Sequence, residues 1–76
     1  MIRFRLKELI AEKEFQQGKR LTLEEVAKST GVHRTTLSKI ANNKKDYSPT
    51  TDVLDKLCEY FDVEIGQVAE YLKSDN

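Results

Sequence analysis

The chain has 76 residues and carries 13 Lys or Arg against 13 Asp or Glu, so its formal net charge is zero. A chain of this length holds one domain at most, with a small core and marginal stability alone. The single cysteine, Cys58, excludes an internal disulfide and suits a reducing compartment. No apolar run approaches the ~18 residues of a membrane span, and no signal-peptide segment is recognisable, so we expect a cytoplasmic protein.

The zero net charge hides an asymmetry along the chain. Residues 1–45 carry 11 Lys or Arg and 5 Glu, whereas residues 46–76 carry 2 Lys and 8 Asp or Glu. A basic half and an acidic half make a dipolar molecule that can orient toward a polyanion. An uneven distribution of acidic and basic residues over solvent-exposed faces, without any role in binding, would give the same split.

Apolar residues at helical spacing predict a first helix at about residues 5–17, ended by a polar turn at Gly18. Its expected packed face holds Leu6, Leu9, Ile10 and Phe15. Before this helix, Ile2 and Phe4 alternate with arginines. That weak strand signal is so short that we interpret it only as an ordered arm.

The second and third helices are marked by strong local signals. Thr22 is followed three residues later by Glu25, which predicts a capping box at the start of the second helix. Gly31 predicts its end, because glycine adopts the left-handed conformation that a tight stop needs. After a turn of three or four residues, a third helix is expected at residues 34–42.

Two more helices are expected in the second half of the chain. The fourth begins near Thr51 and carries a strong apolar stripe, and the fifth runs from about Ile65 to Leu72. The expected fold class is all-α, a compact bundle of five short helices. It forms a single domain at 1–76, with an ordered core at about 3–72 and a polar tail at 73–76.

The middle helix pair has the spacing of a helix-turn-helix. Ala27 is small where the helices cross, and Gly31 permits the sharp turn. Three apolar residues are expected to anchor the third helix on the core, namely Val32, Leu37 and Ile40. An ordinary helical hairpin is the alternative interpretation.

These residues carry a family resemblance. LTLEEVAKSTGVHRTTLSKIANNK resembles the helix-turn-helix of phage-repressor/Cro-like (XRE-type, lambda-repressor-like) DNA-binding domains, and the flanking segments resemble the other helices of that family. The resemblance implies a bacterial or phage-encoded, nucleoid-associated transcription regulator, expected to be a repressor. It also implies a homodimer on a palindromic double-stranded DNA operator, with the third helix in the major groove.

The expected outer face of the third helix has hydroxyls, an amide and cations but no carboxylate. The resemblance places base contacts on Arg34, Thr35 and Lys39, supported by Ser38. Phosphate or backbone contacts are expected from Thr22, His33, Thr36, Asn42, Asn43, Lys44 and Lys45. The backbone N–H groups at the start of the second helix are a further candidate for a phosphate.

Two positions depart from the family pattern. Leu23 stands where the family commonly has a glutamine whose amide grips a phosphate. His33 stands where a serine or threonine usually caps the third helix. Its imidazole either caps that helix less well or contacts a phosphate, more strongly when protonated.

An acidic cluster in the second half of the chain leaves a second hypothesis open. It consists of Asp52, Asp55, Glu59, Asp62 and Glu64, and it is either a solvated face or a surface for a basic protein partner. In the second case the chain is an antitoxin or adaptor-type interaction module that uses the acidic helices at 51–72, with DNA binding secondary.

Self-association is expected through the last helix, at Val68, Tyr71 and Leu72, with the arm at Ile2 and Phe4 as the second candidate. We interpret Cys58 as a small buried hydrophobe. The sequence has no glycine-rich phosphate loop, nucleophile–base pair or metal-ligand spacing. We therefore expect no enzyme activity, no cofactor and no metal.

Overall fold

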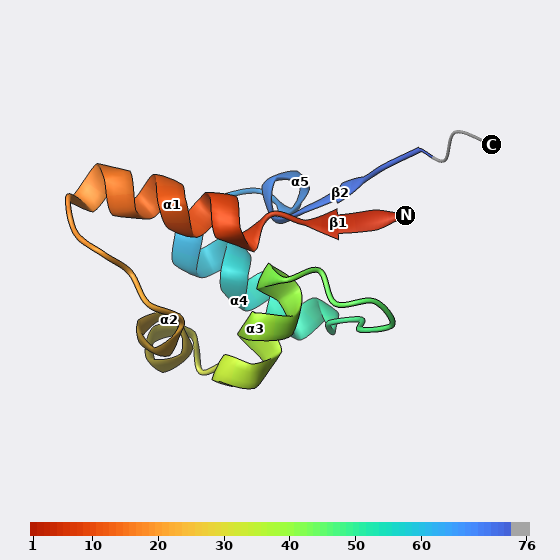
Figure 1. The fold of residues 1–76 in the computed structure, drawn as a ribbon, viewed down its shortest axis with the longest axis horizontal. Coiled ribbons are helices and arrows are strands. Elements are labelled where there is room, and N and C mark those ends of the chain that lie inside the picture. Colours follow the sequence, from red (N-terminus) through yellow and green to blue (C-terminus); the bar gives the residue numbers. More distant parts are fainter. Residues whose placement is uncertain (74–76) are drawn as a thin grey trace.

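The computed structural model describes residues 1–73, which form five helices and a two-stranded sheet (Figure 1). In chain order the elements are β1 (Ile2–Phe4), α1 (Leu6–Gln17), α2 (Leu23–Thr30), α3 (Arg34–Ala41), α4 (Thr51–Phe61), α5 (Ile65–Val68) and β2 (Ala69–Tyr71). The first three helices begin and end within a residue of their predicted bounds, and α4 begins at the predicted Thr51. Of the expected polar tail, residues 74–76 lie outside the described residues.

The helix ends form by the predicted local interactions. The Thr22 hydroxyl accepts a hydrogen bond from the Glu25 N–H at 3.2 Å, and the Glu25 carboxylate accepts one from the Thr22 N–H at 3.3 Å. This reciprocal pair is the predicted capping box. Gly31 ends α2 with a φ of +77°, a conformation that glycine adopts without a Cβ clash.

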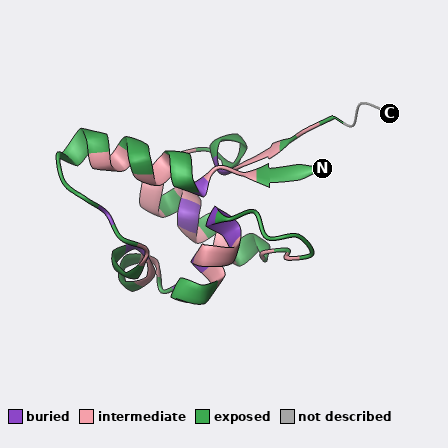
Figure 2. Cartoon of the chain, in the orientation of Figure 1, coloured by how far each residue is buried: buried purple, intermediate pink, exposed green. Residues whose placement is uncertain are grey.

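One apolar core joins all five helices. Its fully or almost fully buried members are Leu6, Leu21, Val26, Val32, Leu37, Ile40, Ala41, Leu57 and Val68. In Figure 2 the buried segments gather where α3 and α4 meet and at the first turn of α1. None of the buried residues in the described part of the chain is polar or charged. The core therefore covers one side of the α2–α3 pair and leaves its other side to solvent.

The expectation of an all-α fold is wrong at the two ends of the chain. The fifth helix stops at Val68 instead of continuing to Leu72, and the chain becomes extended at Ala69, with φ −138° and ψ 134°. The resulting β2 pairs antiparallel with β1. Each segment satisfies the backbone groups of the other, a pairing that local periodicity cannot reveal because the partners lie at opposite ends of the sequence.

Phe15 does not lie on the packed face where it was expected. Its side chain is 84% exposed. The physical reason is its place on the helix, since at ~100° per residue Phe15 lies roughly opposite Leu6 on α1. The side of this turn that faces the rest of the molecule carries Lys13, whose ammonium nitrogen lies 4.5 Å from the centroid of the Tyr60 ring, and Glu14, whose carboxylate accepts a hydrogen bond from the Leu21 N–H at 2.8 Å.

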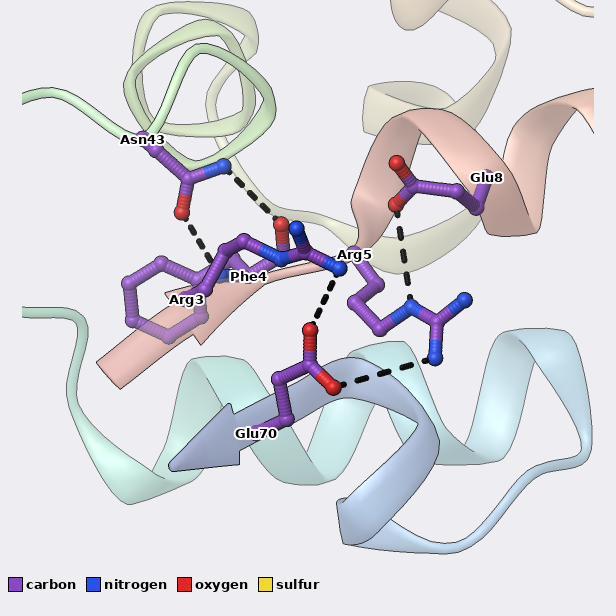
Figure 3. Close-up of polar contacts among 6 residues, drawn as sticks. All are labelled: Arg3, Phe4, Arg5, Glu8, Asn43 and Glu70. Carbon is purple, nitrogen blue, oxygen red and sulfur yellow. Dashed lines mark hydrogen bonds and ion pairs between the residues drawn. The ribbon is translucent and has the colours of Figure 1, made fainter. Parts of the chain in front are cut away.

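Two sets of polar contacts tie the sheet to the bundle (Figure 3). Asn43, just after α3, accepts a hydrogen bond from the Phe4 N–H at 2.6 Å and donates one to the Phe4 carbonyl at 2.9 Å. Its side-chain amide thus pairs with the outer edge of β1 as a neighbouring strand would. On the sheet, the Glu70 carboxylate lies between the guanidinium groups of Arg3 and Arg5.

We predict that Asn43→Asp destabilises the fold by about 1–2 kcal/mol, because a carboxylate oxygen would replace the donor and face the Phe4 carbonyl. Aspartate keeps the size of the side chain and tolerates the φ of +49° found at this residue. Chemical denaturation measures the change. The matched control is Asn42→Asp, whose amide donates only to Ser38 of its own helix. Equal losses for the two variants would show that the bridge to β1 contributes nothing.

Candidate nucleic-acid interface

The turn between α2 and α3 is closed by hydrogen bonds from its own residues. The Gly31 N–H donates to the Ala27 carbonyl at 2.8 Å. The Thr30 hydroxyl donates to the Val26 carbonyl at 2.7 Å and accepts from the Val32 N–H at 3.1 Å. The two helices are therefore held at a defined angle, and the Thr30 hydroxyl is a structural member of the turn.

Apolar contacts fix the rotation of α3 about its own axis. Leu37 and Ile40 are fully buried, and Val32 at the turn and Ala41 at the end of α3 are nearly so. Ala27 is half-buried and packs against the same core. With these side chains inward, α3 presents the opposite face to solvent.

The exposed face of α3 begins with Arg34 and Thr35, which are both exposed. Thr36, Ser38 and Lys39 are half-buried. Among the residues of α3 there is no acid, but Glu24 of α2 lies close by, with its Oε1 3.9 Å from the Nε of Arg34. This exposed ion pair is weak, so it holds the guanidinium near the surface without locking it.

Lys39 is directed by an aromatic neighbour. Its ammonium nitrogen lies 5.3 Å from the centroid of the Tyr47 ring, within the range of a cation–π contact. Tyr47 belongs to the loop between α3 and α4. The Lys39 head group is thus drawn toward that loop, whereas Arg34 and Thr35 stand at the opposite end of α3.

The residues around the end of α3 that we expect to contact phosphates differ in how far their side chains are already hydrogen-bonded within the protein. The Asn42 amide donates to the Ser38 carbonyl at 3.0 Å and remains exposed. Lys44 and Lys45 are exposed in the following loop. The Asn43 side chain is hydrogen-bonded to Phe4 through its oxygen and one N–H, so its phosphate contact stays a prediction for the second N–H of the amide.

His33 at the start of α3 and Thr22 at the start of α2 are also expected to contact phosphates, and their side chains differ in whether they are already hydrogen-bonded. His33 occupies the N-cap position of α3, is exposed, and makes no side-chain hydrogen bond to the helix. The capping alternative is therefore not used. Thr22 has its hydroxyl and its N–H committed to Glu25, so the backbone donors left at the start of α2 are those of Leu23 and Glu24.

An open hollow of about 540 Å³ lies between α1 and the starts of α2 and α3. Its lining includes three cations, Lys7, Arg20 and Arg34, and two carboxylates, Glu14 and Glu24. The Glu14 carboxylate already accepts a hydrogen bond from the Leu21 N–H, and Glu24 lies beside Arg34. Lys7 and Arg20 are candidate site residues that the sequence analysis missed. Helical spacing puts Lys7 on the side of α1 next to Ile10 and Ala11, which line the same hollow, but only the fold brings Arg20 there.

The other residues named in the sequence analysis differ in how far they are buried. Leu23 is half-buried and packs on the core, which explains an apolar residue at that position. Burial, with the Asp55 carboxylate as a second cause, raises the pKa of the Cys58 thiol, so the group is neutral at physiological pH. Of the expected dimer contacts, Val68 is fully buried within the chain, whereas Tyr71 is exposed and Leu72 half-buried.

Within residues 1–73 no three His, Cys, Asp or Glu side chains gather as metal ligands would. The described helices are all too short or too polar to cross a membrane. The five residues of the acidic cluster are exposed, and Asp52 forms an ion pair of 3.0 Å with Lys56.

The comparisons with known proteins agree with this geometry. The chain matches no curated protein sequence. A family model described as a Cro/C1-type HTH DNA-binding domain matches residues 5–74, which include all five helices. The chain therefore belongs to the Cro/C1-type helix-turn-helix DNA-binding domains, a family of double-stranded DNA binders.

Proposed function

We propose that this protein is a sequence-specific transcriptional repressor that inserts α3 into the major groove and acts as a homodimer on a palindromic operator. The observation that carries the proposal is the acid-free outer face of α3, held outward by the burial of Leu37 and Ile40. A major groove admits one α-helix and presents donors, acceptors and thymine methyl groups to it. The hydroxyl and guanidinium groups on α3 match those partners.

Base contacts fall to the first turn of α3. Arg34 is exposed and long enough to place two donors on the O6 and N7 of a guanine. Thr35 beside it offers a methyl group to thymine and a hydroxyl to other base edges. Ser38 and Lys39 follow on the same helix and contact the bases or sugars deeper along the groove.

Phosphate contacts lie on both sides of α3. On one side, the free N–H groups at the start of α2 and the cations of the hollow, Lys7 and Arg20, provide an anion site. On the other side, Lys44 and Lys45 are exposed beside the end of α3. His33 and Thr36, at the start of α3, complete the set that fixes the register of the protein on the duplex.

Arg34→Ala tests base recognition. We expect a loss of about 5- to 150-fold in affinity for the preferred site, corresponding to about 1–3 kcal/mol, with relaxed preference at one base-pair position. Fluorescence anisotropy with a panel of single-base-pair variants measures both effects. Lys56→Ala is the matched control, because it also removes one cation but lies on α4. Unchanged affinity and preference for Arg34→Ala would contradict the proposed base contact.

Lys44→Ala tests a phosphate contact. We expect weaker binding to every duplex by a similar factor, and a slope of log K against log salt that is smaller by about 0.9 per half-site. Titrations across a range of salt concentrations give the slope. If neither Lys44→Ala nor Arg34→Ala changes duplex affinity, the protein-interaction hypothesis through the acidic cluster takes precedence.

Glu24→Gln tests the acid that faces Arg34. We expect about twofold or greater strengthening of binding to all duplexes at low salt, because the change frees Arg34 and removes a carboxylate near the phosphates. Glu59→Gln on α4 is the control with the same change in net charge. Equal effects of the two variants would assign the gain to net charge alone and place Glu24 away from the DNA.

A further inference from the structure

The two cations of α3 are held by different kinds of neighbour. The guanidinium of Arg34 lies beside a carboxylate, with 3.9 Å between its Nε and the Oε1 of Glu24. The ammonium of Lys39 instead lies over the Tyr47 ring, 5.3 Å from its centroid. No carboxylate of residues 1–73 forms an ion pair with Lys39. The position of this ammonium is therefore set by an uncharged ring and not by an anion that would compete with DNA.

The backbone of the loop after α3 fixes Tyr47 relative to Lys39. The Lys44 N–H donates to the Lys39 carbonyl at 2.9 Å, and the Tyr47 N–H donates to the Lys44 carbonyl at 3.2 Å. Both backbone polar groups of Lys44 thus fold the loop back on the end of the helix. Asp46 lies within this turn with a φ of +70°, a left-handed conformation that aspartate tolerates.

The Tyr47 side chain is also held by apolar residues of the fold. Tyr47 is half-buried and packs against the core. It lines a groove of about 330 Å³ together with Phe4, Pro49 and Leu54. Burial removes rotamer freedom from a side chain. The ring is therefore the fixed partner of this contact, and the flexible lysine is the partner whose position is chosen.

The place of Tyr47 opposes the direction that a lysine on a helix takes by default. Side chains of a helix lean toward its N-terminus and cover the preceding turn. For Lys39 that turn carries Thr35 and Thr36, next to the like charge of Arg34. Tyr47 follows the C-terminal end of α3, so the cation–π contact draws the ammonium away from Arg34. The two cations are thereby kept apart along the helix.

We propose that Tyr47 is a positioning residue for base recognition, whose ring holds the Lys39 ammonium near the end of α3 and so assigns it to a different base pair from Arg34. This assignment rests on the proposed insertion of α3 into the major groove. Residues 34 and 39 are separated by about 7.5 Å of helix axis, which exceeds the spacing of about 3.4 Å between neighbouring base pairs. A Lys39 side chain that leaned back would carry its ammonium toward the base pair of Arg34.

The strength of an exposed cation–π contact sets the size of the effect. Such a contact corresponds to about a two- to fivefold bias of the ammonium toward the ring. A bias of this size leaves Lys39 free to bond a base edge beside the ring. It also makes the rotamers that lean toward Arg34 the minor population.

Base preference in Tyr47→Leu tests the proposal. Leucine keeps an apolar side chain in the groove but removes the ring, whereas Tyr47→Phe keeps the ring and removes only the hydroxyl. Fluorescence anisotropy with single-base-pair variants of the preferred site gives the preference as a ratio of two affinities, which does not depend on the folded fraction of a variant. We expect Lys39→Ala to lose preference at a base pair other than the one lost in Arg34→Ala. Tyr47→Leu is expected to reduce preference at the Lys39 base pair about two- to fivefold, and Tyr47→Phe to keep it.

The double variant of Lys39→Ala and Tyr47→Leu separates positioning from a contact that Tyr47 makes itself. In the Lys39→Ala background we expect Tyr47→Leu to change no base preference, because the group that it positions is gone. A further loss in the double variant would overturn the proposal, and so would unchanged preference in Tyr47→Leu. Equal losses in Tyr47→Phe and Tyr47→Leu would overturn it in favour of a contact between the Tyr47 hydroxyl and DNA.

Nuclear magnetic resonance of the free protein gives a readout that needs no DNA. Protons over the face of an aromatic ring resonate upfield, so the ε-methylene signal of Lys39 is expected to move downfield in Tyr47→Leu but not in Tyr47→Phe. Absence of this change would overturn the proposal. Base preference that depends on Arg34 but on neither Lys39 nor Tyr47 would overturn this inference alone and leave the proposed function standing. No base preference in the parent chain would overturn both.

Discussion

Burial of Leu37 and Ile40 is the constraint on which the rest of the molecule depends. Both side chains are fully removed from water, so α3 cannot rotate about its axis without exposing them. That fixed rotation decides that Arg34 and Thr35 face solvent. It also explains why a neutral chain can present a cationic surface, since the acids are concentrated on the other half of the sequence.

The end of α3 is linked directly to the sheet. Asn43 follows the last turn of α3 and holds Phe4 of β1 through two hydrogen bonds (Figure 3). The position of α3 and the position of the sheet are therefore coupled by one side chain.

Local signals in the sequence predicted those elements that depend on neighbouring residues. The capping box at Thr22, the left-handed stop at Gly31 and the apolar spacing of α3 all act within a few residues, so they can be recognised without the fold. The strand pair could not be predicted in this way, because Ile2 and Tyr71 meet only when the core has formed. The same limit explains Asn43, whose turn-forming role was visible but whose partner Phe4 lies 39 residues earlier.

Selection of bound sites from random duplex DNA tests the central claim most directly, namely that α3 reads a major groove in a symmetric dimer. The account predicts a palindromic consensus with two half-sites about 10 base pairs apart, centre to centre, and one strongly preferred guanine in each. A pool that shows no sequence enrichment would contradict base recognition by α3. A single enriched half-site without a symmetric mate would contradict the dimer on DNA.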